Sequence, residues 1–375
     1  MDILELSLTV LAFLTGLSFA VVSPVLPLYV ESFGVSYETL GLFFSAYSLT
    51  WSLLQLYTGY LSDRYGRRRL ALIGLAVYSL SALGCAQARD FTQLFLFRIV
   101  QGVGLGLFGP ALLGLVAGLR RQERAFALYR TAQVAGDVIG PVVGGYLGHI
   151  GLSVPFLLSA VAGGLAIAAT CLIREETSGR ETGEHTGFLT VLRTALSRPG
   201  FLFLCGGAFL AEMGYVARGI AVPLAGEKAG LTTEQIGLAM SAYPLAFVLS
   251  QVPIGVLIER TRRKLVLAGC ALAAALGFLS LFVATSAWGM ALAMGVLGLT
   301  LGTIFVQSAA WIAKLAPPER KSLYLASFDS LIDLSFPATP VLVGLLAGLG
   351  VRVPFLFCAL LLLTSACVLS RVPEG

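Results

Sequence analysis

Charged residues are scarce in this chain of 375 residues: Asp, Glu, Lys and Arg make up 12% of it, against roughly 25% in soluble domains. Hydrophobic residues make up 57%, and the mean hydropathy is +0.88. A surface of this composition would not dissolve in water, whereas a membrane span needs about 20 mainly apolar residues. The alternating segments of roughly 10 residues that are typical of membrane β-barrels are missing from the sequence. The composition therefore predicts an all-α polytopic membrane protein.

Groups that support catalysis or metal binding are also few. The chain has two histidines, His149 and His185. Its six cysteines lie in or at the ends of apolar runs, without a CxxC pair or a Cys/His cluster, so we expect neither a metal site nor a disulfide. The sequence also lacks the Gly-x-x-x-x-Gly-Lys-Ser/Thr loop that holds nucleotide phosphates. We therefore expect no cofactor and no enzyme activity.

The distribution of basic residues predicts the topology. The net charge is +5, but the bases are spread over alternate loops instead of one face, which argues against nucleic-acid binding. The basic loops lie at 64–69, 120–124, 174–198, 260–264 and 314–321. Because Lys and Arg mark cytoplasmic loops, we expect a multi-pass protein of the cell (inner) membrane with both termini in the cytoplasm.

Apolar runs between these loops predict twelve transmembrane helices. They lie near 6–30, 38–61, 69–88, 92–117, 126–148, 152–173, 200–225, 235–258, 265–284, 287–315, 321–348 and 352–371. The predicted domains are a six-helix half at 1–173, a cytoplasmic linker at 174–199 and a second six-helix half at 200–375. Within the linker, 188–196 has the apolar face of an amphipathic helix. That helix either lies along the membrane interface or is simply a tether, which we favour.

The two halves repeat with an offset of 196 residues. The offset pairs Pro27 with Pro223, Gly59 with Gly255, Arg64 with Arg260, Gly102 with Gly298 and Gly106 with Gly302. Parallel halves related by an axis along the membrane normal are one of the plans of secondary transporters. In that plan the substrate binds between the halves near the middle of the membrane.

A dense charged stretch, Gly59-Tyr-Leu-Ser-Asp-Arg-Tyr-Gly-Arg-Arg-Arg69, connects the second and third spans. A run of like charges is usually only a solvated loop. Here, however, Asp63 lies inside the basic run, and Gly59 and Gly66 flank it, which suggests a tight packed turn. A weaker copy at 255–264 has Glu259 in the place of Asp63. The repetition indicates an architectural role for both stretches.

Together, the twelve spans, the parallel halves and the 59–69 stretch resemble the major facilitator superfamily over essentially the whole chain. The 59–69 stretch is similar to that family's loop signature, Gly-x-x-x-Asp-Arg-x-Gly-Arg-Arg/Lys, at nearly every position. Three further stretches, at 17–27, 98–104 and 136–145, resemble motifs of its twelve-span drug–proton antiporters. Ser18 and Ala127 stand where those motifs have glycine.

This resemblance implies a secondary active transporter that works by alternating access and exports small amphiphilic compounds or drugs in exchange for protons. Its expected partners are the substrate, protons and the lipid bilayer, and we expect a monomer. The alternative is a transporter of the same fold for one metabolite, working as a symporter or a facilitator. A membrane-embedded enzyme or a sensor is a remote alternative, because no nucleophile motif and no appended soluble domain occur.

The resemblance also implies a conformational latch, in which Asp63 holds the cytoplasmic side closed in the outward-facing state. Such a charge network would be formed in one state and broken in the other, as a switch requires. The predicted latch residues are Gly59, Asp63, Arg64, Gly66, Arg67, Arg120, Glu259, Arg260 and Arg263.

Ionisable residues at membrane depth are costly and are therefore functional candidates. The candidates for proton coupling are Asp137, Glu212, Asp333, Asp329 and Arg98. Arg98 and Asp137 form either a structural ion pair or a proton-linked switch. Glu212 lies in the middle of an apolar span, where burial disfavours its charged form. It either carries a proton, meets a cationic substrate or bonds to a neighbouring span. Asp329 and Asp333 share a helix face, and of these two we favour Asp333 as the proton candidate.

Glycines in the fifth span predict a seam. Gly136, Gly140 and Gly144 repeat every four residues and so line one helix face, where a neighbouring backbone can approach closely. With Pro141 and Gly145 they predict a hinge and a seal, or ordinary close packing.

The remaining predictions concern the substrate cavity and a gate. The cavity candidates are Gln101, Tyr215, Arg218, Tyr243, Phe305 and Trp311. An aromatic residue in a span more often serves packing than ligand contact. The prolines of Phe336-Pro-Ala-Thr-Pro340 are expected to break or kink the eleventh span, which is a suitable place for a gate.

Overall fold

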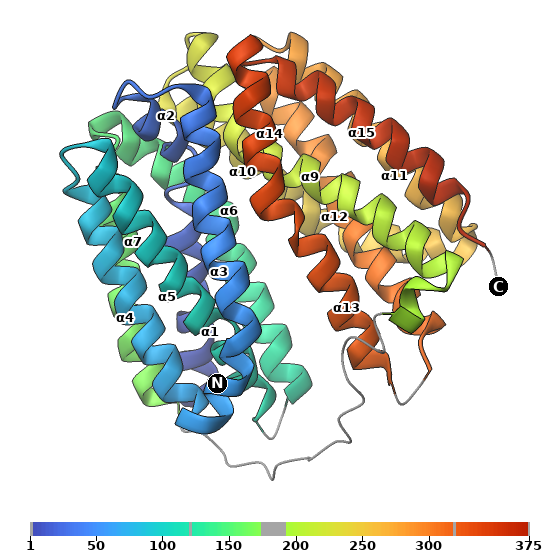
Figure 1. Ribbon diagram of the computed structural model, residues 1–375, viewed down its shortest axis with the longest axis horizontal. Helices are drawn as coiled ribbons and strands as arrows, with labels where there is room; N and C mark the ends of the chain where they lie inside the picture. Colours follow the sequence, from blue (N-terminus) through green and yellow to red (C-terminus); the bar gives the residue numbers. More distant parts are fainter. Residues whose placement is uncertain (1–2, 120–121, 174–192, 318–319, 374–375) are drawn as a thin grey trace. The chain divides into compact units, whose positions relative to one another are not determined.

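The computed structural model describes residues 3–119, 122–173, 193–317 and 320–373 (Figure 1). Within these ranges the chain is almost entirely helical and contains no strand. The helices of the first half are α1 (Ile3–Ala20), α2 (Leu26–Glu31), α3 (Tyr37–Tyr65), α4 (Arg67–Ala86), α5 (Phe91–Ala117), α6 (Gln122–Ile150) and α7 (Val154–Leu172). Those of the second half are α9 (Pro199–Lys228), α10 (Thr233–Arg260), α11 (Arg263–Val283), α12 (Ala287–Leu315), α13 (Lys321–Asp333), α14 (Ser335–Leu349) and α15 (Val353–Ser370).

The predicted all-α fold of twelve spans is confirmed. Each predicted span corresponds to one helix or, for the first and the eleventh, to a consecutive pair. Among the described residues, eight helical stretches are long and apolar enough to cross a membrane by length and composition. The spans outside this group are α1 with α2, α3, α6 and α10.

Two spans are broken. In the first span, α1 ends at Ala20 and α2 begins at Leu26, with Pro27 in its first turn. In the eleventh, α13 ends at Asp333 and α14 begins at Ser335, next to the prolines of the expected break. Proline has no N–H to donate, so a helix accepts it most easily in the first turn. The second break places Asp333 at the last position of α13.

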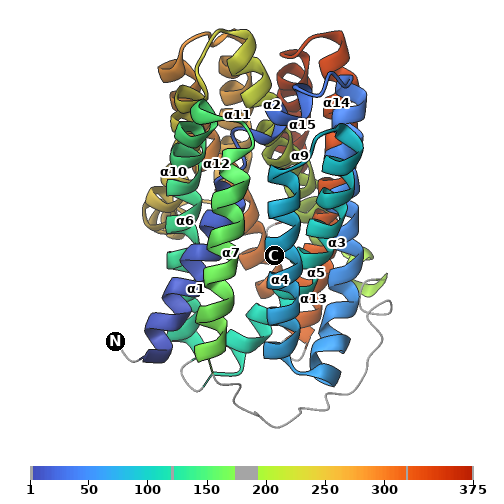
Figure 2. The same cartoon turned by 90° about the vertical axis from the view of Figure 1, so that its left-hand side faces the viewer.

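Close contacts divide the chain into two compact units. Unit 1 comprises Met1–Arg180 with Gly230–Ser241, and unit 2 comprises Glu181–Ala229 with Ala242–Gly375. In unit 1, α1 packs against α6 and α7, and α4 packs against α5 and α7. Figure 2 shows α1, α7 and α4 running side by side. In unit 2, α15 packs against α9 and α11, and α12 packs against the same two helices.

Of the predicted linker at 174–199, the structure describes residues 193–199. Residues 174–192, which carry most of the expected amphipathic helix, lie outside the described residues. Residues 193–196 form one helical turn with Ala195 fully buried. Arg198 then donates a hydrogen bond of 2.9 Å to the Leu315 carbonyl, at the end of α12.

The internal repeat appears as equivalent contacts in the two units. In unit 1, a Cβ on Gly102 of α5 would lie 2.9 Å from the Tyr47 carbonyl oxygen of α3. In unit 2, a Cβ on Gly298 of α12 would overlap the Tyr243 carbonyl of α10. The offset of 196 residues relates both the glycines and the tyrosines. It also relates the next contacts along these helices, those of Gly106 with Trp51 and of Gly302 with Phe247.

Candidate functional site

A buried arginine is stacked on two tyrosines in unit 2. The guanidinium carbon of Arg218 on α9 lies 4.3 Å from the centre of the Tyr215 ring and 3.6 Å from that of Tyr243 on α10. The two ring centres are 5.5 Å apart and the rings are tilted by 55°, so the guanidinium lies in the angle between them. Arg218 is 9% exposed. Stacking on aromatic faces offsets part of the cost of burying this cation.

One carboxylate interacts with this arginine, and a second carboxylate interacts with the first. Glu212 of α9 interacts electrostatically with Arg218 and with Asp333 of α13. Phe336 of α14 adds a third ring, which meets Tyr215 edge to face with 6.3 Å between the ring centres. The α13–α14 break thus lies beside Tyr215 and Glu212, which both interact with the arginine. Of the residues expected to couple protons or line a cavity, the structure brings Glu212, Asp333, Tyr215, Arg218 and Tyr243 together.

Unit 1 also has a buried arginine, Arg98, that stacks on a tyrosine ring. The Arg98 guanidinium carbon lies 3.9 Å from the centre of the Tyr47 ring, and Nη1 donates a hydrogen bond to Gln101 Oε1. Arg98 and Gln101 are three residues apart on α5, so their side chains share a face. Arg98 is 6% exposed and Gln101 is fully buried. The Nε2 group of Gln101 has no hydrogen-bond partner among the described residues.

The expected pairing of Arg98 with Asp137 stays a prediction. Asp137 is half-buried on α6 and interacts electrostatically with Tyr129, two turns before it.

The repeat contains a signal for the position of Tyr47 beside a buried arginine. Tyr47 and Tyr243 are related by the offset of 196 residues, and each stacks on a buried arginine. The arginines themselves are not related by the offset, because Arg98 comes from α5 and Arg218 from α9. Equivalent tyrosines thus hold arginines that arrive from different helices.

Two cavity candidates lie elsewhere in unit 2. Phe305 of α12 is partly exposed and packs against Phe328 of α13, with 5.9 Å between the ring centres. Trp311, two turns further along α12, is buried. Asp329, one turn before Asp333 on α13, is exposed.

The glycine face of α6 packs closely within unit 1. A Cβ on Gly136 would lie 2.5 Å from the Leu17 amide nitrogen of α1, and one on Gly144 would overlap the Val21 carbonyl. Gly140 faces Ala20 in the same way, and Gly145 faces the Thr233 carbonyl at the start of α10. The α6 helix continues through Pro141 without a break.

In the charged stretch at 59–69, the chain changes direction at one glycine, Gly66, and the residues on either side of it are helical. Gly66 has a φ of +92° and separates α3 from α4, whereas Gly59 lies inside α3. Arg67 then donates a 2.8 Å hydrogen bond to the Gly114 carbonyl of α5, and Arg68 donates one to the Cys171 carbonyl of α7. These bonds attach the start of α4 to two neighbouring helices.

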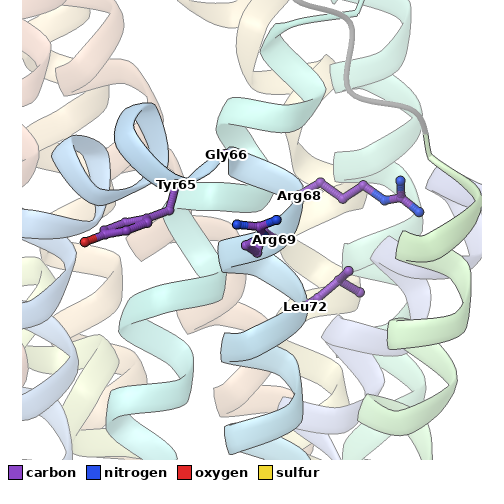
Figure 3. A pocket seen from close by; sticks show the side chains of 5 residues that line it. All are labelled: Tyr65, Gly66, Arg68, Arg69 and Leu72. Atoms are coloured by element: carbon purple, nitrogen blue, oxygen red, sulfur yellow. The ribbon is translucent and has the colours of Figure 1, made fainter.

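A hollow of about 510 Å³ lies beside this turn and is lined by Tyr65, Gly66, Arg68, Arg69 and Leu72. Figure 3 shows the Arg68 side chain extending away from the Tyr65 ring. The side chains of Asp63, Glu259 and Arg260, as well as residue Arg120, lie outside what the structure describes. The ion pairs of the expected latch therefore stay a prediction.

The helical fold and the two units of apolar helices define a multi-pass membrane protein. The family model described as Major Facilitator Superfamily matches residues 8–217 and 204–374. The chain therefore belongs to the Major Facilitator Superfamily, a family of transporters.

Among curated proteins, the chain is similar to the quinolone resistance protein NorA of Staphylococcus aureus, at 29% identity over 175 residues. That match covers 46% of this chain and 45% of NorA, so the chain spans about half the length of these relatives. Multidrug resistance protein 2 of Bacillus subtilis is 24% identical over 373 residues, covering 94% of this chain and 90% of that protein.

Solved structures share the fold. The nucleoside transporter NupG aligns with a TM-score of 0.82 at 14% identity, covering 99% of this chain and 98% of NupG. A bacterial homologue of the human lysosomal transporter Spinster, in an inward-facing and occupied conformation, aligns with a TM-score of 0.77 at 15% identity. That match covers 97% of this chain and 95% of the homologue.

Proposed function

We propose that this protein exports small amphiphilic compounds across the cell (inner) membrane in exchange for protons, by alternating access. The observation that carries this proposal is the pair of carboxylates, Glu212 and Asp333, beside a cluster of aromatic rings in one unit. Two close carboxylates resist ionising together, so one of them is suited to take up and lose a proton. The names of the two curated relatives, which concern drug resistance, support the substrate class.

Glu212 is the first candidate for the proton carrier and Asp333 the second. Both lie close to the α13–α14 break, where a change of helix geometry can alter their surroundings. Arg98, Asp137 and Asp329 are further candidates for the coupling. The glycine face of α6 acts as the seam. The 59–69 stretch and its copy at 255–264, which contains Arg263, together act as the latch. Both termini lie in the cytoplasm, and the protein works as a monomer.

A second candidate function is the transport of one polar metabolite by the same fold. The buried Arg98–Gln101 pair favours it, because the unbonded Nε2 of Gln101 is a donor of the kind that recognises a polar group. The two structural neighbours are transporters of other kinds, one of them a nucleoside transporter.

Transport in proteoliposomes tests both candidates. The purified protein is reconstituted, a pH gradient is imposed, and movement of a fluorescent amphiphilic dye is followed with and without an ionophore that collapses the gradient. We expect dye movement against its concentration gradient only while the pH gradient lasts. Dye movement that ignores the gradient would exclude proton coupling. If Asp137→Asn, Glu212→Gln and Asp333→Asn all retain gradient-driven movement, the proton carrier lies elsewhere.

A further inference from the structure

The rings around Arg218 form a site that suits a planar cation. Tyr215, Tyr243 and Phe336 come from α9, α10 and α14, and the rings contact one another in sequence. The guanidinium lies 3.6 and 4.3 Å from two ring centres, well within the roughly 6 Å over which a ring face attracts a cation. Because the rings are tilted towards each other, a flat cationic group contacts both faces at once.

The charges nearby also favour a cation in this place. Glu212 interacts electrostatically with Arg218 and Tyr243, and Asp333 interacts with Glu212. If Arg218 were a receptor for an anionic ligand, these two carboxylates would oppose the ligand. The same carboxylates attract a cationic group that enters the angle between the rings. The charges around the rings therefore favour a cationic ligand over an anionic one.

Arg218 occupies the place between the rings, but within the described part of the chain one of its hydrogen-bond donors is unbonded there. Its Nε is buried and has no hydrogen-bond partner among the described residues. Leaving a buried donor unbonded costs free energy, and its unbranched side chain has several rotatable bonds. A guanidinium that leaves the rings can move towards Glu212, with which Arg218 already interacts electrostatically. Arg218 can therefore give up this place to a better cation.

We propose that the Tyr215–Tyr243–Phe336 rings bind amidinium or guanidinium groups of substrates, and that Arg218 is a tethered competitor which the substrate must displace. The proposal rests on the proposed transport function, for which it names a substrate class. It predicts that removing the competitor tightens binding, whereas removing a ring weakens it.

Three probes of nearly equal shape test the charge preference: benzamidinium, benzamide and benzoate. Their binding to the detergent-solubilised full chain is measured by titration calorimetry at one pH, without a gradient. We expect the wild type to bind benzamidinium more tightly than benzamide, and benzamide more tightly than benzoate. A preference for benzoate would show that Arg218 receives an anion, and equal affinities would show that charge is not recognised. Either result overturns the proposal without the use of any variant.

Variants then test the competition. Arg218→Gln should raise the affinity for benzamidinium by roughly tenfold or more, the size of one desolvated cation–π contact, while benzamide binding changes little. Arg218→Lys keeps a charge but loses the planar group, so a smaller increase is expected. Adding Tyr243→Leu to Arg218→Gln should remove the gain. An unchanged or lower benzamidinium affinity in both Arg218 variants would refute the competitor role.

The matched controls lie away from the rings. Arg130→Gln and Tyr146→Leu make the same replacements at exposed positions of α6 and should leave benzamidinium affinity at the wild-type value. Because binding is measured without a gradient, its outcome is separate from the transport assay. Benzamidinium binding without gradient-driven transport would reject proton-coupled export and retain the site, whereas transport without this binding preference would reject only the site.

Discussion

The Arg98 guanidinium carbon lies 3.9 Å from the centre of the Tyr47 ring, and the hydroxyl of that ring is buried without a hydrogen-bond partner among the described residues. The ring face therefore stabilises Arg98, whereas the hydroxyl contributes little or is unfavourable. Tyr47 thus supports the buried charge of unit 1 through its aromatic face.

Substitutions at Tyr47 should distinguish the contribution of its ring face to stability from that of its hydroxyl. Tyr47→Phe keeps the face, so the thermal unfolding temperature of the solubilised protein should stay the same or rise. Tyr47→Leu removes the face from a buried cation and should cost on the order of 2 kcal/mol, seen as a lower unfolding temperature. Tyr57→Leu, at a ring that is 66% exposed, is the control and should have little effect. Equal unfolding temperatures for the Leu and Phe variants at position 47 would argue against the stacking.

The glycine face of α6 leads to a prediction about packing. A Cβ on Gly144 would overlap the Val21 carbonyl, so Gly144→Ala must push the backbones apart. Overpacking of this kind costs about 1–3 kcal/mol, and we expect less folded protein in size-exclusion chromatography and a lower unfolding temperature. Gly164→Ala on α7 is the matched control, because nothing lies within 4 Å of its added methyl group. The same loss in both variants would mean that close approach at Gly144 is not the cause.

The sequence was sufficient to predict the helices and the closest helix contacts. Apolar runs located every span because crossing a bilayer needs about 20 mainly apolar residues. Within lipid the backbone must also bond to itself, which makes such a run a helix. Glycines at every fourth position of α6 identified a face that the structure packs against α1, and the offset of 196 residues identified equivalent contacts in the two units. These features depend on spacing along one helix, which the sequence contains directly.

The partners of the buried charges could not be predicted in the same way. The sequence alone did not indicate that Arg98 bonds to Gln101 and stacks on the Tyr47 ring. That choice depends on the rotation of α5 about its axis and on side-chain rotamers. Likewise, Glu212 and Arg218 are six residues apart, on different faces of α9, yet they interact in the folded unit. Spacing alone does not determine such contacts.

A substitution at Glu212 should separate coupling from binding. Glu212→Gln keeps the size of the side chain but cannot release a proton, so gradient-driven dye movement should fall by tenfold or more, on the order of losses seen for essential acid–base groups. Exchange of dye across the membrane at equal pH should continue, because it needs no net proton movement. The readouts are dye fluorescence with and without the gradient. Glu227→Gln, an exposed position on the same helix, is the control.

Two outcomes would contradict this assignment of Glu212. If Glu212→Gln retains concentrative transport, another carboxylate carries the proton, and Asp333→Asn becomes the next variant to measure. If Glu212→Gln loses equal-pH exchange as well, Glu212 serves the binding or the structure of the site and not the coupling alone. The unfolding temperature of the variant distinguishes these last two roles.

The two glycines of the 59–69 stretch should respond in opposite directions to alanine. Gly66 has a φ of +92°, a conformation that costs other residues about 1–3 kcal/mol, so Gly66→Ala should lower the unfolding temperature. Gly59 lies inside α3 with nothing within 4 Å of an added Cβ, and replacing a helical glycine by alanine gains about 0.5–1 kcal/mol. Gly59→Ala should therefore leave the unfolding temperature unchanged or raise it. A loss of transport in Gly59→Ala at full stability would instead indicate that a partner approaches Gly59 during the transport cycle, whereas a destabilised Gly59→Ala would contradict its helical setting.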